Sequence, residues 1–162
     1  MRRYPQHLRG FDYSGPYRYF LTLCTHDRAR HFVDARHVAL VCEQFQRAAS
    51  EQAFAVIAYC FMPDHVHLLL AGERDDADLK RFTKWAKQYS GFYFRQRTRL
   101  YLWQRYGFER VLRNDEATAV VARYTIANPV RAGLVRSPAE YPFWGSFLYT
   151  REALLEYIQR AA

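Results

Sequence analysis

The 162-residue sequence has few cysteines and no long apolar run. Its three cysteines, Cys24, Cys42 and Cys60, lie far apart, and the absence of any Cys-x-x-Cys pair excludes a zinc ribbon. Each lies in an apolar stretch, so we expect buried free thiols in a reducing compartment. No apolar run reaches the roughly 20 residues of a membrane-spanning helix. The first residues lack the apolar segment of a signal peptide, and we expect a cytoplasmic protein with no membrane partner.

Acidic residues are in the minority, with 16 Asp and Glu against 24 Lys and Arg. The formal net charge of +8 predicts a polyanionic partner, although charge alone does not distinguish a nucleic acid from a membrane surface. Aromatic residues make up 17% of the chain, and their mixture with Arg and Lys suits a single-stranded nucleic acid, whose bases stack while cations hold its phosphates. The alternative is that most of these aromatics form the core.

Half of the residues are apolar, and no repeat or low-complexity linker divides the chain, so we expect a single domain over residues 1–162. Stretches rich in β-branched and aromatic residues predict four strands, at residues 17–25, 54–61, 66–71 and 103–112. Apolar residues at helical spacing predict three helices, at residues 35–52, 79–94 and from 114 or 115 to 127. Pro129 is expected to end the last of these at Asn128.

The predicted order is therefore β-α-β-β-α-β, followed by one more helix. This order is typical of the α+β class, in the ferredoxin-like or split β-α-β arrangement, with an antiparallel sheet and two helices on one face. The other face is expected to be open for another use. We expect residues 1–16 to form a basic N-terminal arm, and residues 147–162 to form a peripheral segment with a short helix at 151–159.

Two histidines, His65 and His67, begin the third strand in the stretch CFMPDHVHLLL. Side chains alternate along a strand, so both imidazoles lie on one face while Val66, Leu68 and Leu70 pack under the helices on the other. Imidazoles two residues apart can chelate one metal ion. A His-x-His pair is also common in proteins that bind no metal, and two ligands rarely suffice.

A third ligand is offered by the stretch VVARYTIANPVRAGLV, residues 120–135. Tyr124 and Asn128 are four residues apart, so they project from the same side of the predicted helix near its end. The amide oxygen of Asn128 could complete the metal site, with Tyr124 standing over the ion. Asn128 could instead simply end the helix before a proline, and Tyr124 could be a core aromatic. The coincidence with the histidine pair favours the site.

At these two motifs the sequence resembles the HUH superfamily of single-strand DNA endonucleases. MPDHVHLLL is similar to its histidine strand and RYTIANPVRAGLV to its tyrosine helix. Together with FLTLCTHDR, LWQRYGFERVLRN and YPFWGS, they resemble the single-tyrosine transposases of the branch associated with repetitive extragenic palindromes (REP). The resemblance runs from about Tyr17 to Ser146. Other insertion-sequence relatives usually carry glutamine as the third ligand, whereas this branch resembles the present chain in using asparagine at the position of Asn128.

The resemblance implies a DNA-cleaving and -joining transposase with Tyr124 as the nucleophile on an additional active-site helix. It implies His65, His67 and Asn128 as ligands of Mg²⁺ or Mn²⁺, and a hairpin-bearing single-stranded DNA as substrate. Cleavage would pass through a covalent 5′-phosphotyrosine, which conserves the phosphodiester energy, so that rejoining needs no ATP. The absence of a glycine-rich phosphate-binding loop agrees with this chemistry.

Residues 79–105 carry eight Lys or Arg and no Asp or Glu. On one helix such a stripe is often only a solvated face, but here it continues beyond the predicted helix, which favours a phosphate-binding surface. The candidate DNA-binding residues are Lys80, Arg81, Lys84, Lys87, Arg95, Arg97, Arg99 and Arg105, with Arg2 and Arg3 in the N-terminal arm.

Two other functional classes compete with the transposase hypothesis. A non-catalytic DNA- or RNA-binding module would stack bases on the open sheet face, but it would leave the histidine pair unused. A zinc hydrolase would need an activating glutamate near the histidines, which the sequence lacks. The remaining histidines, at positions 7, 26, 31 and 37, show no ligand spacing and are expected to be structural or exposed. A nucleoid-associated monomer or homodimer agrees with all of these features.

Overall fold

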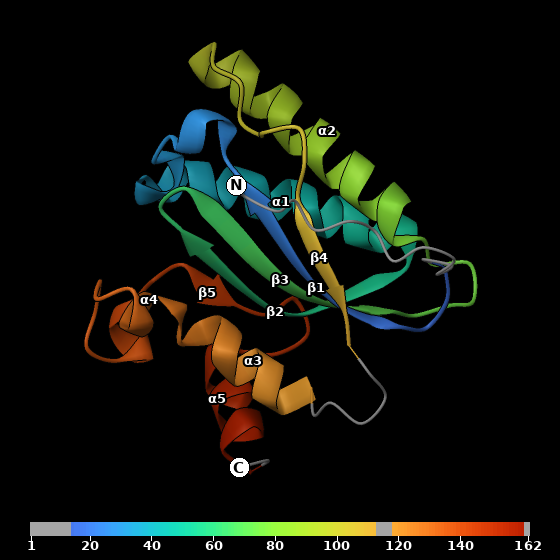
Figure 1. Cartoon of the computed structure of the whole chain (residues 1–162), viewed down its shortest axis with the longest axis vertical. Helices are drawn as coiled ribbons and strands as arrows, with labels where there is room; N and C mark the ends of the chain where they lie inside the picture. Colours follow the sequence, from blue (N-terminus) through green and yellow to red (C-terminus); the bar gives the residue numbers. More distant parts are fainter. Residues whose placement is uncertain (1–13, 113–117, 161–162) are drawn as a thin grey trace, which may run out of the picture.

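The computed structural model describes residues 14–112 and 118–160. It contains a five-stranded antiparallel sheet in the order β4-β1-β3-β2-β5 (Figure 1). The strands are β1 (Arg18–Cys24), β2 (Phe54–Met62), β3 (His65–Gly72), β4 (Phe108–Val111) and β5 (Trp144–Gly145). The first four follow the order of a split β-α-β fold, and β5 adds a short strand beside β2. The predicted α+β class is confirmed.

The helices are α1 (Ala35–Gln52), α2 (Leu79–Thr98), α3 (Thr118–Ile126), α4 (Asn128–Arg131) and α5 (Arg151–Arg160). Three 3₁₀ turns lie between them, η1 (His26–Arg28), η2 (His31–Val33) and η3 (Pro138–Glu140). The first two helices begin at aspartate caps, because Asp34 accepts a hydrogen bond from the Arg36 N–H and Asp78 from the Lys80 N–H. Within the described residues, no helix combines the length and the apolar character needed to cross a membrane.

Two predicted boundaries on the long basic segment differ from the structure. The strand expected at 103–112 is only β4, and Trp103 contributes a single bridge to Thr25. Helix α2 runs four residues past the predicted end at Phe94, because it stops only where Arg99 takes a left-handed conformation (φ 68°). The capping residues expected at 114 or 115 lie outside the described residues.

The prediction that Pro129 ends the helical segment is wrong in part. Helix α3 stops at Ile126, but a new turn, α4, begins at Asn128 with Pro129 in its first positions. A proline is tolerated there because its missing N–H would have no partner in the first turn of a helix. Ala127 keeps a right-handed helical conformation (φ −83°, ψ −6°), so the helical path continues past Asn128, and Arg131 Nη2 donates to the Tyr124 carbonyl.

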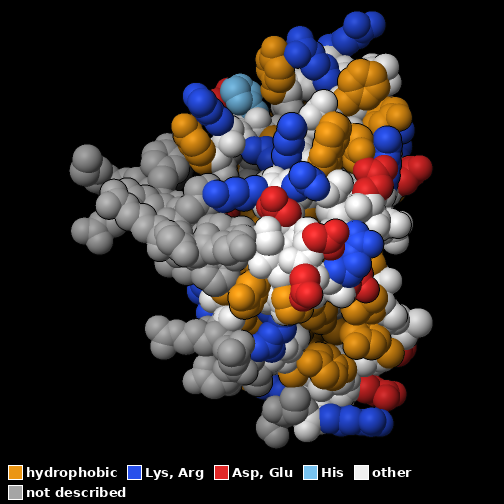
Figure 2. All heavy atoms as spheres, turned by 90° about the vertical axis from the view of Figure 1, so that its right-hand side faces the viewer, with side chains coloured by type: hydrophobic (Ala, Val, Ile, Leu, Met, Phe, Trp, Pro, Cys, Tyr) orange, Lys and Arg blue, Asp and Glu red, His pale blue; other side chains and the backbone are white. Residues whose placement is uncertain are grey.

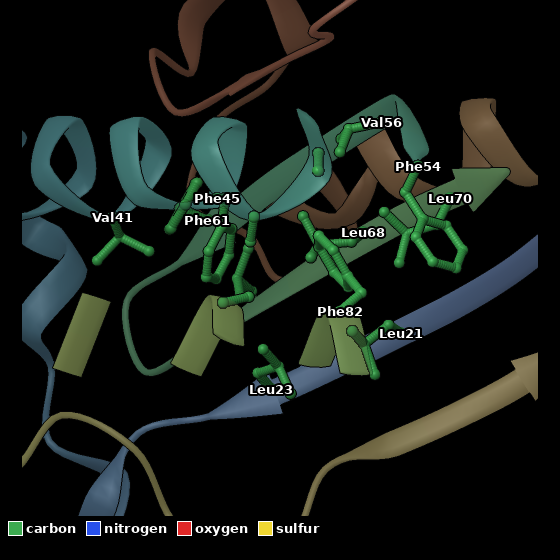
Figure 3. Close-up of a cluster of buried hydrophobic side chains, with 14 of the residues drawn as sticks. Leu21, Leu23, Val41, Phe45, Phe54, Val56, Phe61, Leu68, Leu70 and Phe82 are labelled. Atoms are coloured by element: carbon green, nitrogen blue, oxygen red, sulfur yellow. The ribbon is translucent and has the colours of Figure 1, made fainter. Parts of the chain in front are cut away.

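The main core lies between the sheet and the pair α1 and α2 (Figure 3). Alternate residues of β3 supply its centre, since Val66, Leu68 and Leu70 are fully buried there. Phe45 from α1 and Phe82 from α2 pack against them and are also fully buried. Burial of a side chain of this size contributes about 1.5–3 kcal/mol. The predicted alternation along the histidine strand is confirmed.

The second face of the sheet was expected to be open, but it is covered. Helix α3 lies against β2 and β3 on this face and α5 packs against α3 (Figure 1), and a second apolar core joins the two helices to the sheet. Its members include Leu69 of β3, Ala122 of α3, and Leu154 and Ile158 of α5, all of them buried. Helix α5 was expected to be peripheral, but its two apolar side chains, four residues apart, anchor it in this core.

Candidate active site

His65 and His67 lie on the side of β3 that faces away from α1 and α2. In the sheet, His67 pairs with Thr22 of β1 and Cys60 of β2, at the end of β3 nearest the β2–β3 turn. The two imidazole rings meet edge to face, with centroids 4.7 Å apart. Both rings therefore lie on one face of the sheet, as predicted, and both are only partly exposed.

Each imidazole is held through its Nδ1 atom. His65 Nδ1 lies 2.7 Å from Asp64 Oδ1, and His67 Nδ1 lies 2.8 Å from Thr22 Oγ1. Asp64 is itself held by Arg28, whose Nε lies 2.9 Å from Oδ2. Metal-binding histidines typically donate the N–H of the nitrogen that does not bind the ion to an oxygen of this kind. The arrangement leaves Nε2 of both rings as the nitrogen available to a ligand.

The charge states of these groups suit a cation. Burial lowers the pKa of His67 to about 3, with further lowering by His65 and Arg131, so the ring is neutral near pH 7. Burial tends to raise the pKa of Asp64, but hydrogen bonds from Arg28 and His65 outweigh it, and the pKa is lowered below its usual value. A neutral imidazole is the form that binds metal ions.

The tyrosine helix meets the histidine strand at Phe20 of β1. The Phe20 ring stacks on His67 at 5.2 Å and meets the Tyr124 ring edge to face at 6.2 Å. Tyr124 is 54% exposed, so its phenol remains accessible to a substrate. This exposure excludes the alternative that Tyr124 is only a core aromatic. The two sequence motifs, about 60 residues apart, are therefore neighbours in the fold.

Asn128 is held by the turn that follows Tyr124. Its Nδ2 donates to the Thr125 carbonyl at 3.0 Å, and its Oδ1 accepts from Arg131 Nη2 at 2.8 Å. The guanidinium carbon of Arg131 also lies 3.7 Å from the centre of the Tyr124 ring. One arginine thus contacts both the predicted nucleophile and the predicted third ligand, and its charge acts on His67 as well.

The donor types of the predicted set, two imidazole nitrogens and an amide oxygen, are ones that bind divalent cations. In the described part of the chain, no three His, Cys, Asp or Glu side chains are grouped so that they could hold a metal ion. A metal at the histidine pair would therefore take a further protein ligand of another type, and the amide oxygen of Asn128 has the required chemistry. In this structure Arg131 donates a hydrogen bond to that oxygen, and its positive charge would oppose a cation there.

The predicted DNA-binding residues are spread over the length of α2 and the loop after it. Figure 2 shows Lys and Arg side chains among hydrophobic side chains over the upper part of the molecule, where α2 lies in Figure 1. Most of them are exposed on the described surface, namely Lys80, Arg81, Lys84, Arg95, Arg97, Arg99 and Arg105. Arg2 and Arg3 lie outside the described residues.

Lys87 differs from the other members of the stripe. Its Nζ donates to the carbonyls of Gln104 at 2.8 Å and Arg105 at 3.0 Å, and burial lowers its pKa. The side chain therefore fastens the loop after α2 to the helix. Its contribution to a DNA-binding surface stays a prediction, but the structure gives it a different task.

Sequence reasoning missed four residues of the site: Phe20, Thr22, Asp64 and Arg131. Asp64 could have been found, because it directly precedes His65 and a carboxylate partner is common beside a metal-binding histidine. Thr22 and Phe20 are about 45 residues from His67, and only the register between β1 and β3 brings them to it. Arg131 is three residues after Asn128 and seven after Tyr124, and this spacing brings it to both only because the helical path continues past Pro129, which was not expected from the sequence.

These features belong to the transposases, the enzymes that cleave and join DNA. A family model described as an IS200-like transposase matches residues 15–125, more than half of the chain. The chain belongs to this family, and the resemblance to the single-tyrosine transposases is confirmed.

The relatives agree with the family match. A Haemophilus influenzae protein described as a REP-associated tyrosine transposase is 27% identical over an alignment of 136 residues, and the match covers 77% of each chain. A solved structure of a REP-associated tyrosine transposase bound to a REP hairpin is similar with a TM-score of 0.70, at 20% identity, covering 89% of this chain and 82% of that one. A crystal structure of a Deinococcus radiodurans protein described as a transposase is similar with a TM-score of 0.52, at 23% identity, covering 76% and 97%. At these identities the two structures show the fold.

Proposed function

We propose that the protein is a metal-dependent endonuclease and strand transferase that acts on hairpin-bearing single-stranded DNA. The observation that carries this proposal is that Phe20 contacts both the His67 ring and the Tyr124 ring, so the two predicted motifs lie on one side of the sheet. The solved relative is bound to a REP hairpin, which supports a substrate of the same kind for this chain. Such a substrate agrees with a cytoplasmic, nucleoid-associated location.

His65, His67 and Asn128 would hold Mg²⁺ or Mn²⁺. When bound, the ion would supply positive charge to the scissile phosphate and orient it. The chain prepares this site through Asp64 and Thr22, which fix the two rings with Nε2 toward the ligand. The buried environment of His67 keeps its ring neutral, so no proton competes for Nε2 near pH 7.

Tyr124 would be the nucleophile. Its phenolic oxygen forms a bond to the scissile phosphorus while the bond from phosphorus to the 3′ oxygen breaks. The phenol loses its proton and the leaving 3′ oxygen gains one, so the products are a 5′-phosphotyrosine and a free 3′-hydroxyl. A 3′-hydroxyl can later attack the phosphotyrosine and rejoin a strand without ATP, because one phosphodiester is exchanged for another. Arg131, over the Tyr124 ring, would hold the ring in place during both steps.

The decisive test uses a labelled DNA hairpin with single-stranded flanks, Mn²⁺ and a denaturing gel. Wild type should form a covalent adduct that EDTA prevents. Tyr124→Phe should form none yet still bind DNA, because only the phenolic oxygen is lost. Tyr93→Phe is the matched control, since Tyr93 is also an exposed tyrosine but lies on α2.

Two results would contradict the proposal. An adduct that persists in Tyr124→Phe would remove Tyr124 from the mechanism. Tight hairpin binding by wild type without any adduct, at every Mn²⁺ concentration tested, would favour the non-catalytic binding module instead.

A further inference from the structure

An exposed group of aromatic and basic side chains surrounds the end of α2. Phe92 and Tyr101 are 56% and 60% exposed, which is unusual for side chains of this size. Arg95 and Arg99 are exposed as well, and the ring of His26 in η1 contacts the ring of Tyr101. We call these five residues the aromatic–basic patch. None of them has a part in the cleavage chemistry proposed above.

The patch is built on a firmly held loop. After Arg99 the chain turns back along α2, where the Trp103 indole donates to Ser90 Oγ at 2.8 Å. Leu102 is buried, and its carbonyl accepts from the His26 N–H at 2.9 Å. Tyr101 therefore stands between a helix end and a buried neighbour, and its exposure is not a consequence of a loose loop. A side chain held in this way loses little entropy on binding.

The geometry around Tyr101 suits a nucleic acid base. The guanidinium of Arg95 lies 4.2 Å from the centre of the Tyr101 ring, and the His26 ring centroid lies 5.9 Å from it. Since the Arg95 guanidinium lies over one face of the ring, a base can stack on the other face while the arginines hold the neighbouring phosphates. Phe92 lies three residues before Arg95 on α2, so it extends the same surface along the helix.

The patch and the histidine pair are at the same end of the sheet, because Cys24, two residues before His26, pairs with His65. Thr25, next to His26 in the chain, donates to the Asp64 carbonyl from both its N–H and its Oγ1, each at 3.0 Å. Asp64 in turn holds His65. The ring contact of Tyr101 with His26 and the hydrogen bonds of Thr25 and His65 to Asp64 therefore form a chain of contacts from the patch to the predicted metal ligands, and a DNA strand could pass around this end of the sheet from one to the other.

We propose that the aromatic–basic patch binds the single-stranded DNA that flanks the hairpin, with a base stacked on Tyr101 and phosphates against Arg95 and Arg99. The positive charge of the patch complements the phosphates, and its exposed rings complement unpaired bases. This inference rests on the proposed function, since it takes hairpin DNA as the substrate. Its consequence is that the patch distinguishes a flanked hairpin from a blunt one.

The test compares two DNA ligands by fluorescence anisotropy, a hairpin with single-stranded flanks and the same hairpin with blunt ends. Wild type should bind the flanked hairpin more tightly. Tyr101→Ala should weaken that binding by roughly 5- to 150-fold, the range that loss of one base–aromatic stack gives. Binding of the blunt hairpin should not change. Tyr101→Phe should keep wild-type binding because it keeps the ring.

Tyr149→Ala is the matched control, because Tyr149 is an exposed tyrosine that stacks on Tyr157 of α5, in the other layer. It should bind both ligands as wild type does. A second measurement places the fluorescent base 2-aminopurine at successive positions of the flank. At one position its fluorescence should be quenched on binding to wild type and to Tyr101→Phe, but not on binding to Tyr101→Ala.

The inference is overturned if Tyr101→Ala weakens the binding of neither DNA ligand, or weakens the binding of both equally. It is also overturned if 2-aminopurine fluorescence is quenched at no position of the flank. These results leave the proposed function standing as long as Tyr124 still forms its adduct. Wild type that binds neither hairpin and forms no adduct would overturn both.

Discussion

Replacement of Thr22 by valine tests how the site is prepared. Thr22 Oγ1 lies 2.8 Å from His67 Nδ1, and valine keeps the shape of the side chain while it removes this oxygen. Valine is favoured in strands, so β1 should form as before. The lost hydrogen bond should lower the free energy of unfolding by only about 0.5–1.5 kcal/mol.

The expected effect on metal binding is larger. Without the oxygen, the proton of the His67 ring is free to move to Nε2, the nitrogen that would bind the cation. Loss of such a partner typically lowers metal affinity or activity about 10- to 100-fold, which corresponds to about 1.4–2.8 kcal/mol. We therefore expect Thr22→Val to bind Mn²⁺ and to form the Tyr124 adduct more weakly by a factor in this range.

The assay combines calorimetric titration with Mn²⁺ and the rate of adduct formation on hairpin DNA. Thr22→Ser is the control, because it keeps the hydroxyl and should retain most of both properties. Thermal unfolding shows whether either variant is damaged in its fold. Wild-type Mn²⁺ affinity and adduct rate in a folded Thr22→Val protein would refute the assigned role of Thr22, and with it the use of His67 through Nε2.

Three further predictions concern charge at the site and on α2. In metal-free buffer, the protein should become less stable as the pH falls below about 6.5, by up to about 1.4 kcal/mol per pH unit. The reason is that the unfolded chain binds a proton that the folded chain, with His67 buried and neutral, excludes. In urea unfolding, His67→Gln should lose less stability at acid pH than wild type does. If Lys80 and Lys84 hold phosphates, the double variant Lys80→Gln with Lys84→Gln should reduce the slope of log affinity for DNA against log salt concentration by about 1.4. Lys87→Gln should mainly lower the melting temperature. An unchanged slope in the double variant would show that the stripe is only a solvated face. Arg131→Ala should slow adduct formation about 2- to 5-fold through loss of the cation–π contact, yet tighten Mn²⁺ binding, as titration with and without DNA can show.

Local patterns predicted most of the scaffold from the sequence. The helix at 35–52 has the bounds that its apolar spacing indicated, and the histidine strand alternates as predicted because one of its faces must be buried. Helix α5 was expected to be peripheral because it is short, and the spacing of its apolar residues was not considered. Leu154 and Ile158 are four residues apart and apolar, and that spacing would have indicated a buried face.

The parts that could not be predicted depend on contacts between distant segments. Thr22 reaches His67 only through the register of β1 and β3, for which neither stretch carries a local signal. In the sequence, Lys87 is one more member of a basic stripe. In the structure, the loop after α2 turns back and places two carbonyls against its ammonium group. In each case the polar partner is a consequence of the tertiary fold.

The Arg131 prediction follows from one oxygen with two possible partners. Asn128 Oδ1 accepts from Arg131 in this structure, and the same oxygen would ligate the metal. The guanidinium also contributes positive charge near His67, so it occupies the electrostatic place of the cation. Charge repulsion from an arriving divalent ion would weaken the bond from Arg131 to this oxygen, so that the guanidinium, still over the Tyr124 ring, could bind a DNA phosphate. Removal of the arginine should therefore favour the metal when it is alone and disfavour DNA when the metal is bound. A variant that loses affinity for both equally would show instead that Arg131 only supports the turn at Asn128.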